Sequence, residues 1–201
     1  IKVKILATDS NKKLINVAKK KNKNPDIEYK IINFDKILNI KDNHFDVGLC
    51  LFGIYYAKNI NKILKEIKKK IIKDGKIILV GPLRDNKIDF NQILEKAANK
   101  KLPKLVGSSR FDSVIYNSTK KKFKNIKLKK FFNKLKIKDK NVFINYTISS
   151  ITNKRGVYKK FLKNRNIHQI KNNIIKIADK TLLSKNYLTI SKKVGAIIAK
   201  K

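Results

Sequence analysis

Several residue types are scarce in this sequence, and each shortage excludes a class of protein. A single cysteine, Cys50, cannot form a disulfide within the chain, so we exclude a disulfide-stapled secreted domain and expect a cytoplasmic protein. Its place inside an apolar run favours a small buried side chain over a nucleophile. Seven glycines and three prolines among 201 residues exclude a collagen-like or linker-rich chain. No apolar run approaches the ~18 residues that a membrane-spanning helix needs.

Histidine and acidic residues are scarce as well. The two histidines, His44 and His168, lie far apart in the sequence and have no supporting cluster of cysteine or acidic residues. We therefore expect no metal site. Acidic residues number 14 against 51 basic ones, which gives a formal net charge of +37. A charge of this size raises the question of nucleic-acid binding.

The distribution of the basic residues argues against a dedicated nucleic-acid surface. Nearly all of them are lysines, and lysine lacks the planar guanidinium that reads base edges and pairs with phosphates. The lysines are spread along the whole chain beside many isoleucines and asparagines, three residue types that share A/T-rich codons. We favour solvated surface lysines, and we expect only non-specific, salt-sensitive binding of polyanions.

The first 81 residues alternate strand and helix patterns, and 42% of the chain is hydrophobic, which is enough to build a core. Such alternation predicts a parallel sheet with right-handed crossovers. The nearly continuous apolar run Phe45–Ile54 is typical of a strand buried on both faces. The other patterns predict strands at Lys2–Thr8, Ile27–Ile32 and Ile77–Val80, a first helix capped by Ser10 with Leu14, Val17 and Ala18 on its apolar face, and a second helix over Ile60–Ile71.

Two features of the remaining sequence complete this description. Lys73-Asp74-Gly75 is expected to end the second helix, with the glycine in the left-handed conformation. Beyond residue 81 we predict a helix at Phe90–Ala98, a strand at Phe123–Phe132 whose aromatic side chains alternate into the core, mostly helix over Asp139–Leu183, and a strand at Leu188–Ala199.

Three aspartates are distinguished by their position relative to the predicted strands. Asp9 and Asp35 each follow the end of a strand, whereas Asp46 begins one. Ligands of open α/β sheets bind beyond the carboxyl ends of the strands. Asp9 is therefore a candidate acceptor for ribose hydroxyls and Asp35 for an adenine amino group, while Asp46 belongs to the opposite edge. Each is alternatively an ordinary loop or capping aspartate.

The order and spacing of five segments carry a family resemblance. These segments are Ile5–Asn11, Tyr29–Leu38, Asn43–Val47, Leu51–Tyr56 and Ile71–Ile78. In this order the chain resembles the small-molecule branch of the class I S-adenosylmethionine-dependent methyltransferases. The resemblance implies an α/β, Rossmann-like, doubly wound and mostly parallel sheet, with a helical cap inserted before the last strand. It divides the chain into a methyltransferase core (residues 1–81), an acceptor-binding region that lends strand 123–132 to the sheet (residues 82–186), and a final strand (residues 187–201).

The resemblance also implies a cofactor, S-adenosylmethionine, and residues that bind it. Asp9, with Ser10 beside it, would hold the ribose, and Asp35 and Lys36 would hold the adenine. Leu51 stands where the family often has a small hydroxyl residue, so only its backbone would serve. The family's glycine-rich loop should precede Asp9 by about 20 residues. We therefore expect an N-terminal segment to be missing, with one more strand between those ending at Asp9 and Leu51.

The reaction implied is methyl transfer to an O, N or C atom of a small molecule. Tyr55 and Tyr56 follow the family's fourth strand, where an acceptor would enter, and Arg110 lies in a polar loop where it would hold an anionic acceptor. Each has a structural alternative, packing for the tyrosines and an exposed surface position for the arginine. The competing hypothesis is a non-catalytic protein that binds RNA or another polyanion on the same fold, supported by the basic and aromatic strand Phe123–Phe132.

Overall fold

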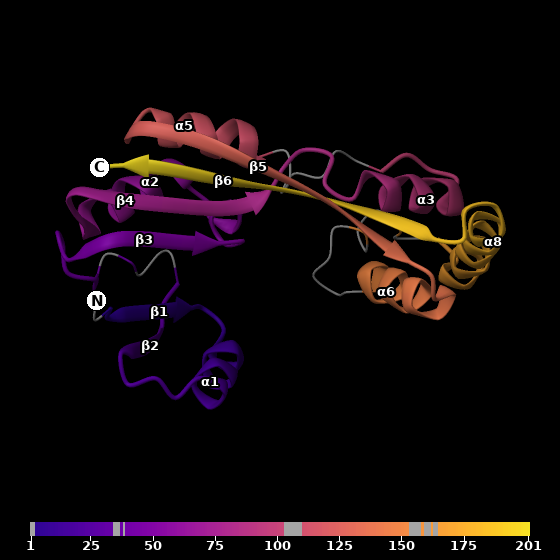
Figure 1. The fold of residues 1–201 in the computed structure, drawn as a ribbon, viewed down its shortest axis with the longest axis horizontal. Helices are drawn as coiled ribbons and strands as arrows, with labels where there is room; N and C mark the ends of the chain where they lie inside the picture. The colour runs from indigo at the N-terminus through magenta and orange to yellow at the C-terminus, as the bar shows by residue number, and fades with distance from the viewer. Residues whose placement is uncertain are drawn as a thin grey trace.

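The computed structural model describes residues 3–33, 37, 39–102, 110–152, 158, 162 and 165–201 (Figure 1). The strands are β1 (Ile5–Asp9), β2 (Ile27–Ile31), β3 (Phe45–Leu51), β4 (Ile71–Pro82), β5 (Lys124–Ile137) and β6 (Leu188–Lys200). The helices are α1 (Lys12–Lys21), α2 (Ile60–Lys70), α3 (Ile88–Ala98), α5 (Tyr116–Lys120), α6 (Lys140–Thr152) and α8 (Ile167–Lys185), with short helical turns η2 (Ile54–Tyr56) and η3 (Phe111–Ile115).

The described strands form two sheets. β1 pairs in parallel with β2, and the second sheet has the order β3-β4-β6-β5. In that second sheet β3 and β4 are parallel, whereas β6 runs antiparallel to both β4 and β5. Helices α3, α6 and α8 lie beyond the end toward which β3 and β4 point, and they precede the last strand, β6 (Figure 1). The predicted α/β fold with a helical cap before the final strand is confirmed, and its sheet is mixed.

Two apolar clusters hold these layers together. In the first, Ile60, Ile63 and Leu64 of α2 pack with residues of β4 and β6, as the helical spacing predicts. The second joins the cap helices α3, α6 and α8 to β6, and it includes Phe90, Phe143 and Ile174 among its fully buried side chains. The cap therefore has a core of its own beside the core of the sheet.

The end of α2 differs from the sequence prediction. The helix ends at Lys70, and β4 begins at the next residue. Asp74, with a φ of 64°, takes the left-handed conformation that we had expected of Gly75, and no described glycine has a positive φ. Gly75 is required for another reason. A Cβ atom there would lie 2.4 Å from Cγ2 of Ile71 and 2.8 Å from the backbone oxygen of Asp46.

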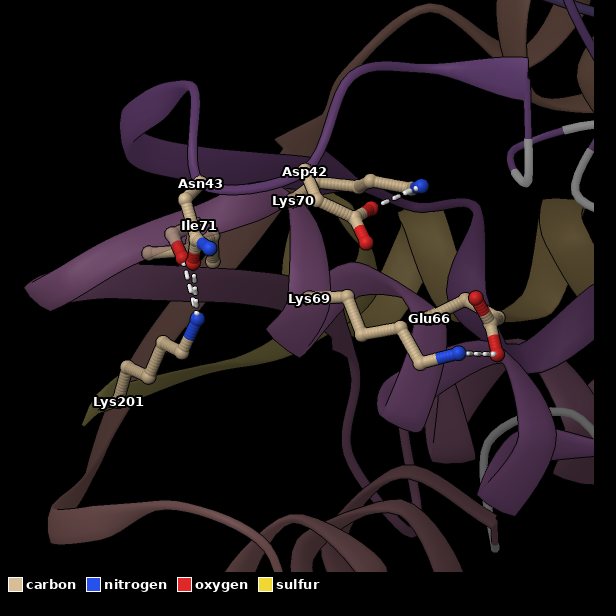
Figure 2. Close-up of polar contacts among 7 residues, drawn as sticks. All are labelled: Asp42, Asn43, Glu66, Lys69, Lys70, Ile71 and Lys201. Carbon is tan, nitrogen blue, oxygen red and sulfur yellow. Dashed lines mark hydrogen bonds and ion pairs between the residues drawn. The ribbon is translucent and has the colours of Figure 1, made fainter.

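Polar contacts fix the amino end of β3 against the end of α2 (Figure 2). The backbone nitrogens of Asn43 and His44 donate to the carbonyls of Lys69 and Lys70. Lys70 also pairs with Asp42, and this hydrogen bond lowers the pKa of the Asp42 carboxyl. Lys201, which follows β6, donates to Asn43 and to the carbonyl of Ile71. These contacts hold the amino ends of β3 and β4 together at one end of the sheet.

The aromatic residues of β5 contradict the expectation that they enter the core. Phe131 and Phe132 are 56% and 67% exposed. Successive side chains of a strand point to opposite faces, so the exposure of both residues shows that neither face of β5 is covered here. β5 is also an edge strand, because it pairs with β6 and has no described strand on its other side. No helix among the described residues is long and apolar enough to cross a membrane.

The close approach at Gly75 gives a stability prediction. Gly75→Ala should lower the free energy of unfolding by about 1–3 kcal/mol, because the new methyl group meets backbone that cannot move aside. Urea denaturation measures this loss. Gly48→Ala is the matched control in the neighbouring strand, since a Cβ there meets a side-chain methyl of Ile71 at 3.2 Å, which can shift. Equal losses for the two variants would contradict this account of Gly75.

Candidate functional site

A cavity of about 620 Å³ lies between β1 and β3 and extends to their carboxyl ends. This volume is within the usual range for sites that bind small molecules and cofactors. No described strand lies between β1 and β3, where we expected one more strand of the family. The lining joins the two sheets and includes Asp9, Ser10, Leu14, Leu49, Leu51 and Tyr56.

Asp9 ends β1 and turns its carboxylate toward the loop that begins α1. One carboxylate oxygen, Oδ1, accepts a hydrogen bond from the backbone nitrogen of Asn11 at 2.7 Å. Asn11, and not Ser10 as expected, then caps α1 by accepting from the backbone nitrogen of Lys13. The other oxygen, Oδ2, has no hydrogen-bond partner among the described residues, so it can accept from a ligand. Ser10 is exposed beside it.

The cavity wall formed by β3 is more exposed than expected. Leu49 and Leu51 are 61% and 59% exposed, which contradicts a strand buried on both faces. The reason is that β3 pairs with β4 on one side and borders the cavity on the other. On the facing helix α1, Ile15 is buried while Leu14 and Val17 are exposed, so the predicted apolar face was wrong by one position.

Tyr55, Tyr56 and Arg110 come together just after β3. Tyr56 is 77% exposed and lines the cavity, whereas Tyr55 packs against the core of the sheet. Burial raises the pKa of the Tyr55 phenol, which therefore stays protonated at neutral pH. Arg110 donates from Nη1 to the Tyr55 carbonyl at 3.2 Å, although 55 residues separate them. The arginine is thus held next to the residue that precedes Tyr56, although it does not itself line the cavity.

The other predicted residues divide into three groups. Asp35 and Lys36 lie outside the described residues. Asp46 lies at the amino end of β3, away from Asp9, and His44 beside it is exposed. The described residues contain no group of three or more side chains that could hold a metal ion. Cys50 lines the cavity from β3, and burial raises the pKa of its thiol, so it is not a nucleophile at neutral pH.

Sequence patterns do not indicate most of the lining, of which Leu14 and Phe52 are two examples. The helical pattern places Leu14 on the packed face of α1, and the apolar run extends the strand through Phe52. Phe52 has a φ of 52°, a left-handed conformation that is uncommon for a large side chain. No sequence pattern indicates such a conformation at phenylalanine.

Comparisons with known proteins match the first part of the chain to a family model. Residues 2–79 match the family described as methyltransferase domain. The comparison with curated proteins gave no match. Among solved structures, the chain is similar to the BH2331 protein of Bacillus halodurans C-125, with 12% identity, a TM-score of 0.59, and coverage of 98% of this chain and 83% of that one.

Two further solved structures agree with this likeness. The YcgJ protein of Bacillus subtilis has 12% identity and a TM-score of 0.54, over 98% of this chain and 82% of that one. A SAM-dependent methyltransferase of Archaeoglobus fulgidus has 12% identity and a TM-score of 0.50, over 98% of this chain and 75% of that one.

These findings define the fold. The chain has the Rossmann-like fold of the class I methyltransferases. Residues 2–79 match the methyltransferase domain family, and the solved structures agree in fold.

The burial of Cys50 gives a prediction about its reactivity. Alkylation of the native protein by iodoacetamide at pH 7.5 should be slower than alkylation in urea by about fivefold or more, because the raised pKa of the thiol leaves little thiolate. Mass spectrometry gives both rates without ambiguity, since Cys50 is the only cysteine. Equal rates in the two solvents would show a freely ionised, accessible thiol.

Proposed function

We propose that S-adenosylmethionine binds at the carboxyl ends of β1 and β3, where Asp9 and Leu51 line the cavity, and that the chain transfers the methyl group to an O, N or C atom of a small molecule. The observation that supports this most is the meeting of Asp9 and Leu51 in one cavity, because these residues come from separate sheets. Residues 1–81 would bind the cofactor, residues 82–186 the acceptor, and residues 187–201 complete the sheet. A cytoplasmic location stays a prediction.

The residues present fit the adenosine half of the cofactor. Asp9 Oδ2 would accept from the ribose hydroxyls, while Oδ1 stays bonded to Asn11 and keeps the carboxylate oriented. The exposed apolar face of Leu49 and Leu51 provides a surface on which a flat base can pack. Ser10 would lie beside the ribose, and Asp35 and Lys36 stay candidates for the adenine. The bound cofactor supplies an electrophilic methyl group attached to a sulfonium.

The role of the protein in the transfer is to position the acceptor and exclude water. Much of the rate of such a displacement comes from holding nucleophile and methyl group in line, so no acid–base pair is needed for an acceptor that is already nucleophilic. Tyr56, which lines the cavity, would contact the acceptor. Tyr55 keeps its proton, and its carbonyl holds Arg110, so the guanidinium is fixed where it can bind a negative group.

One observation favours the competing hypothesis of a polyanion-binding protein. Phe131 and Phe132 are exposed on β5, where Lys129 and Lys130 precede them. Exposed aromatic rings among lysines are able to stack on unpaired bases. The same edge position also explains the lysines without RNA, because charged side chains protect an edge strand from pairing with other chains.

The site predicts a selective effect of Asp9→Asn on cofactor binding. This change keeps Oδ1 for Asn11 and replaces Oδ2 by a donor, so the affinity for S-adenosylmethionine should fall by about 10–150-fold, equivalent to roughly 1.5–3 kcal/mol. Calorimetry measures the affinity, in a protein that includes any residues preceding Ile1. Asp46→Asn, at the other end of the sheet, is the control and should bind normally. Normal binding by Asp9→Asn would remove Asp9 from the site.

The two hypotheses predict different RNA binding. For a methyltransferase with dispersed lysines, affinity for single-stranded RNA should fall by about 10³–10⁵ between roughly 50 and 200 mM salt if 6–10 phosphates are contacted. Phe131→Ala and Phe132→Ala should not change it. Fluorescence anisotropy measures the affinities. If bases stack on these rings, each substitution should weaken RNA binding by about 1–3 kcal/mol. Such losses, with tight binding at physiological salt, would favour the RNA-binding protein.

A further inference from the structure

Two lysines and a tyrosine meet beyond the carboxyl end of β4, on elements that are far apart in the sequence. Lys87 precedes α3, Tyr146 is in α6 and Lys192 is in β6. The Nζ atoms of Lys87 and Lys192 lie 5.1 Å and 5.7 Å from the centroid of the Tyr146 ring. All three side chains are half-buried. We call these residues the Tyr146 cluster.

The backbone holds the cluster in place. Lys87 has a φ of 63°, and its backbone nitrogen donates to the carbonyl of Ser191 at 2.9 Å. Asn86 accepts from the backbone nitrogen of Lys193 at 2.9 Å. The turn between β4 and α3 is therefore tied to β6 on both sides of Lys192. This arrangement brings the two lysines together by folding, unlike the lysines dispersed over the surface.

The positive charges of the cluster have no acidic partner. Neither Lys87 nor Lys192 forms an ion pair with any described residue. Asp89, two residues after Lys87, accepts from both the backbone nitrogen and the hydroxyl of Ser191. The Tyr146 hydroxyl oxygen is itself buried without a hydrogen-bond partner. The two half-buried ammonium groups repel each other. A negative group between them would offset this repulsion and could also accept from the unpartnered hydroxyl.

The pKa values of the two phenols in this region, Tyr158 and Tyr146, shift in opposite directions. Tyr158 donates to Asn91 at 2.7 Å, and burial raises its pKa to about 12. Burial would raise the pKa of Tyr146 too, but Lys87 and Lys192 outweigh it and lower the pKa. The ring of Phe90 contacts both phenols and forms an apolar wall. The space around the Tyr146 hydroxyl therefore favours an anion.

We propose that Lys87, Lys192 and Tyr146 bind a phosphate group carried by the methyl acceptor. Two ammonium groups match the charge of a phosphate dianion, and the tyrosine hydroxyl supplies a third hydrogen-bond donor. The cluster lies beyond the carboxyl end of β4, on the side toward which β1 and β3 also point (Figure 1). The acceptor role rests on the proposed function, because it requires S-adenosylmethionine at the same end of the sheet.

Inorganic phosphate tests the site directly. Protein labelled with [¹³Cζ]tyrosine has seven tyrosine signals, of which Tyr146 is assigned by loss in Tyr146→Phe. At constant ionic strength, phosphate should shift the Tyr146 signal saturably. Lys87→Gln and Lys192→Gln should each weaken this binding by about tenfold or more, the loss of a charged hydrogen bond. Acetate, a single negative charge, should bind at least about tenfold more weakly than phosphate.

Lys136 provides a matched control on the exposed strand β5. Its Nζ lies 4.6 Å from the ring centroid of Tyr187, so it forms a similar pair of ammonium and ring without a second lysine. Lys136→Gln should leave phosphate binding at Tyr146 unchanged. A Tyr146 shift that is linear and parallel to that of Tyr187 would overturn the proposal, as would acetate binding as tightly as phosphate.

Calorimetry with S-adenosylmethionine on the same samples separates this proposal from the proposed function. The lysine variants should bind the cofactor normally. Cofactor binding without saturable phosphate binding would overturn the phosphate site alone. Phosphate binding without cofactor binding would overturn the acceptor role together with the proposed function.

Discussion

The parallel pairing of β3 with β4 is the constraint on which both parts of the site depend. Its register places Leu51 opposite Val80, so the two strands end side by side. The cofactor cavity opens at the end of β3, and the turn that carries Lys87 follows the end of β4. A slip of one residue would turn the alternate side chains of β3 to the opposite face and remove Leu49 and Leu51 from the cavity. α2 and the polar contacts at the amino end of β3 hold this register.

β6 connects the cofactor side of the molecule to the acceptor side. It pairs with β4 and β5 along the sheet, packs into both apolar clusters, and carries Lys192. β6 follows the cap helices in the chain and packs against them, so it joins the cap to the sheet. The Tyr146 cluster, at the junction of cap and sheet, therefore exists only in the folded protein.

Regular apolar spacing made much of the fold predictable from the sequence. The pattern of Ile60, Ile63 and Leu64 predicted α2, and the strand positions were right to within a few residues in most cases. The exposure of Leu49 was not predictable, because an apolar run does not reveal whether a neighbouring strand covers it. The exposure of Phe131 was not predictable either, because alternation in a strand does not show which of its faces are covered.

The candidate site was predictable only where strand ends could be located. Asp9 was found because it follows a strand, and the family resemblance then gave it a role. The capping of α1 by Asn11 was missed because serine and asparagine are both good N-caps. Tyr146 and its lysines were missed because 59 residues separate Tyr146 from Lys87 and 46 separate it from Lys192, and no local pattern joins them.

The central claim is that S-adenosylmethionine binds at the carboxyl ends of β1 and β3. Hydrogen–deuterium exchange with and without the cofactor maps the binding site along the chain most directly. We expect slower exchange at residues 8–11 and 49–53 and unchanged exchange at residues 42–46, which lie at the opposite end of β3. Protection confined to residues 42–46, or the same exchange everywhere in the presence of saturating cofactor, would contradict the claim.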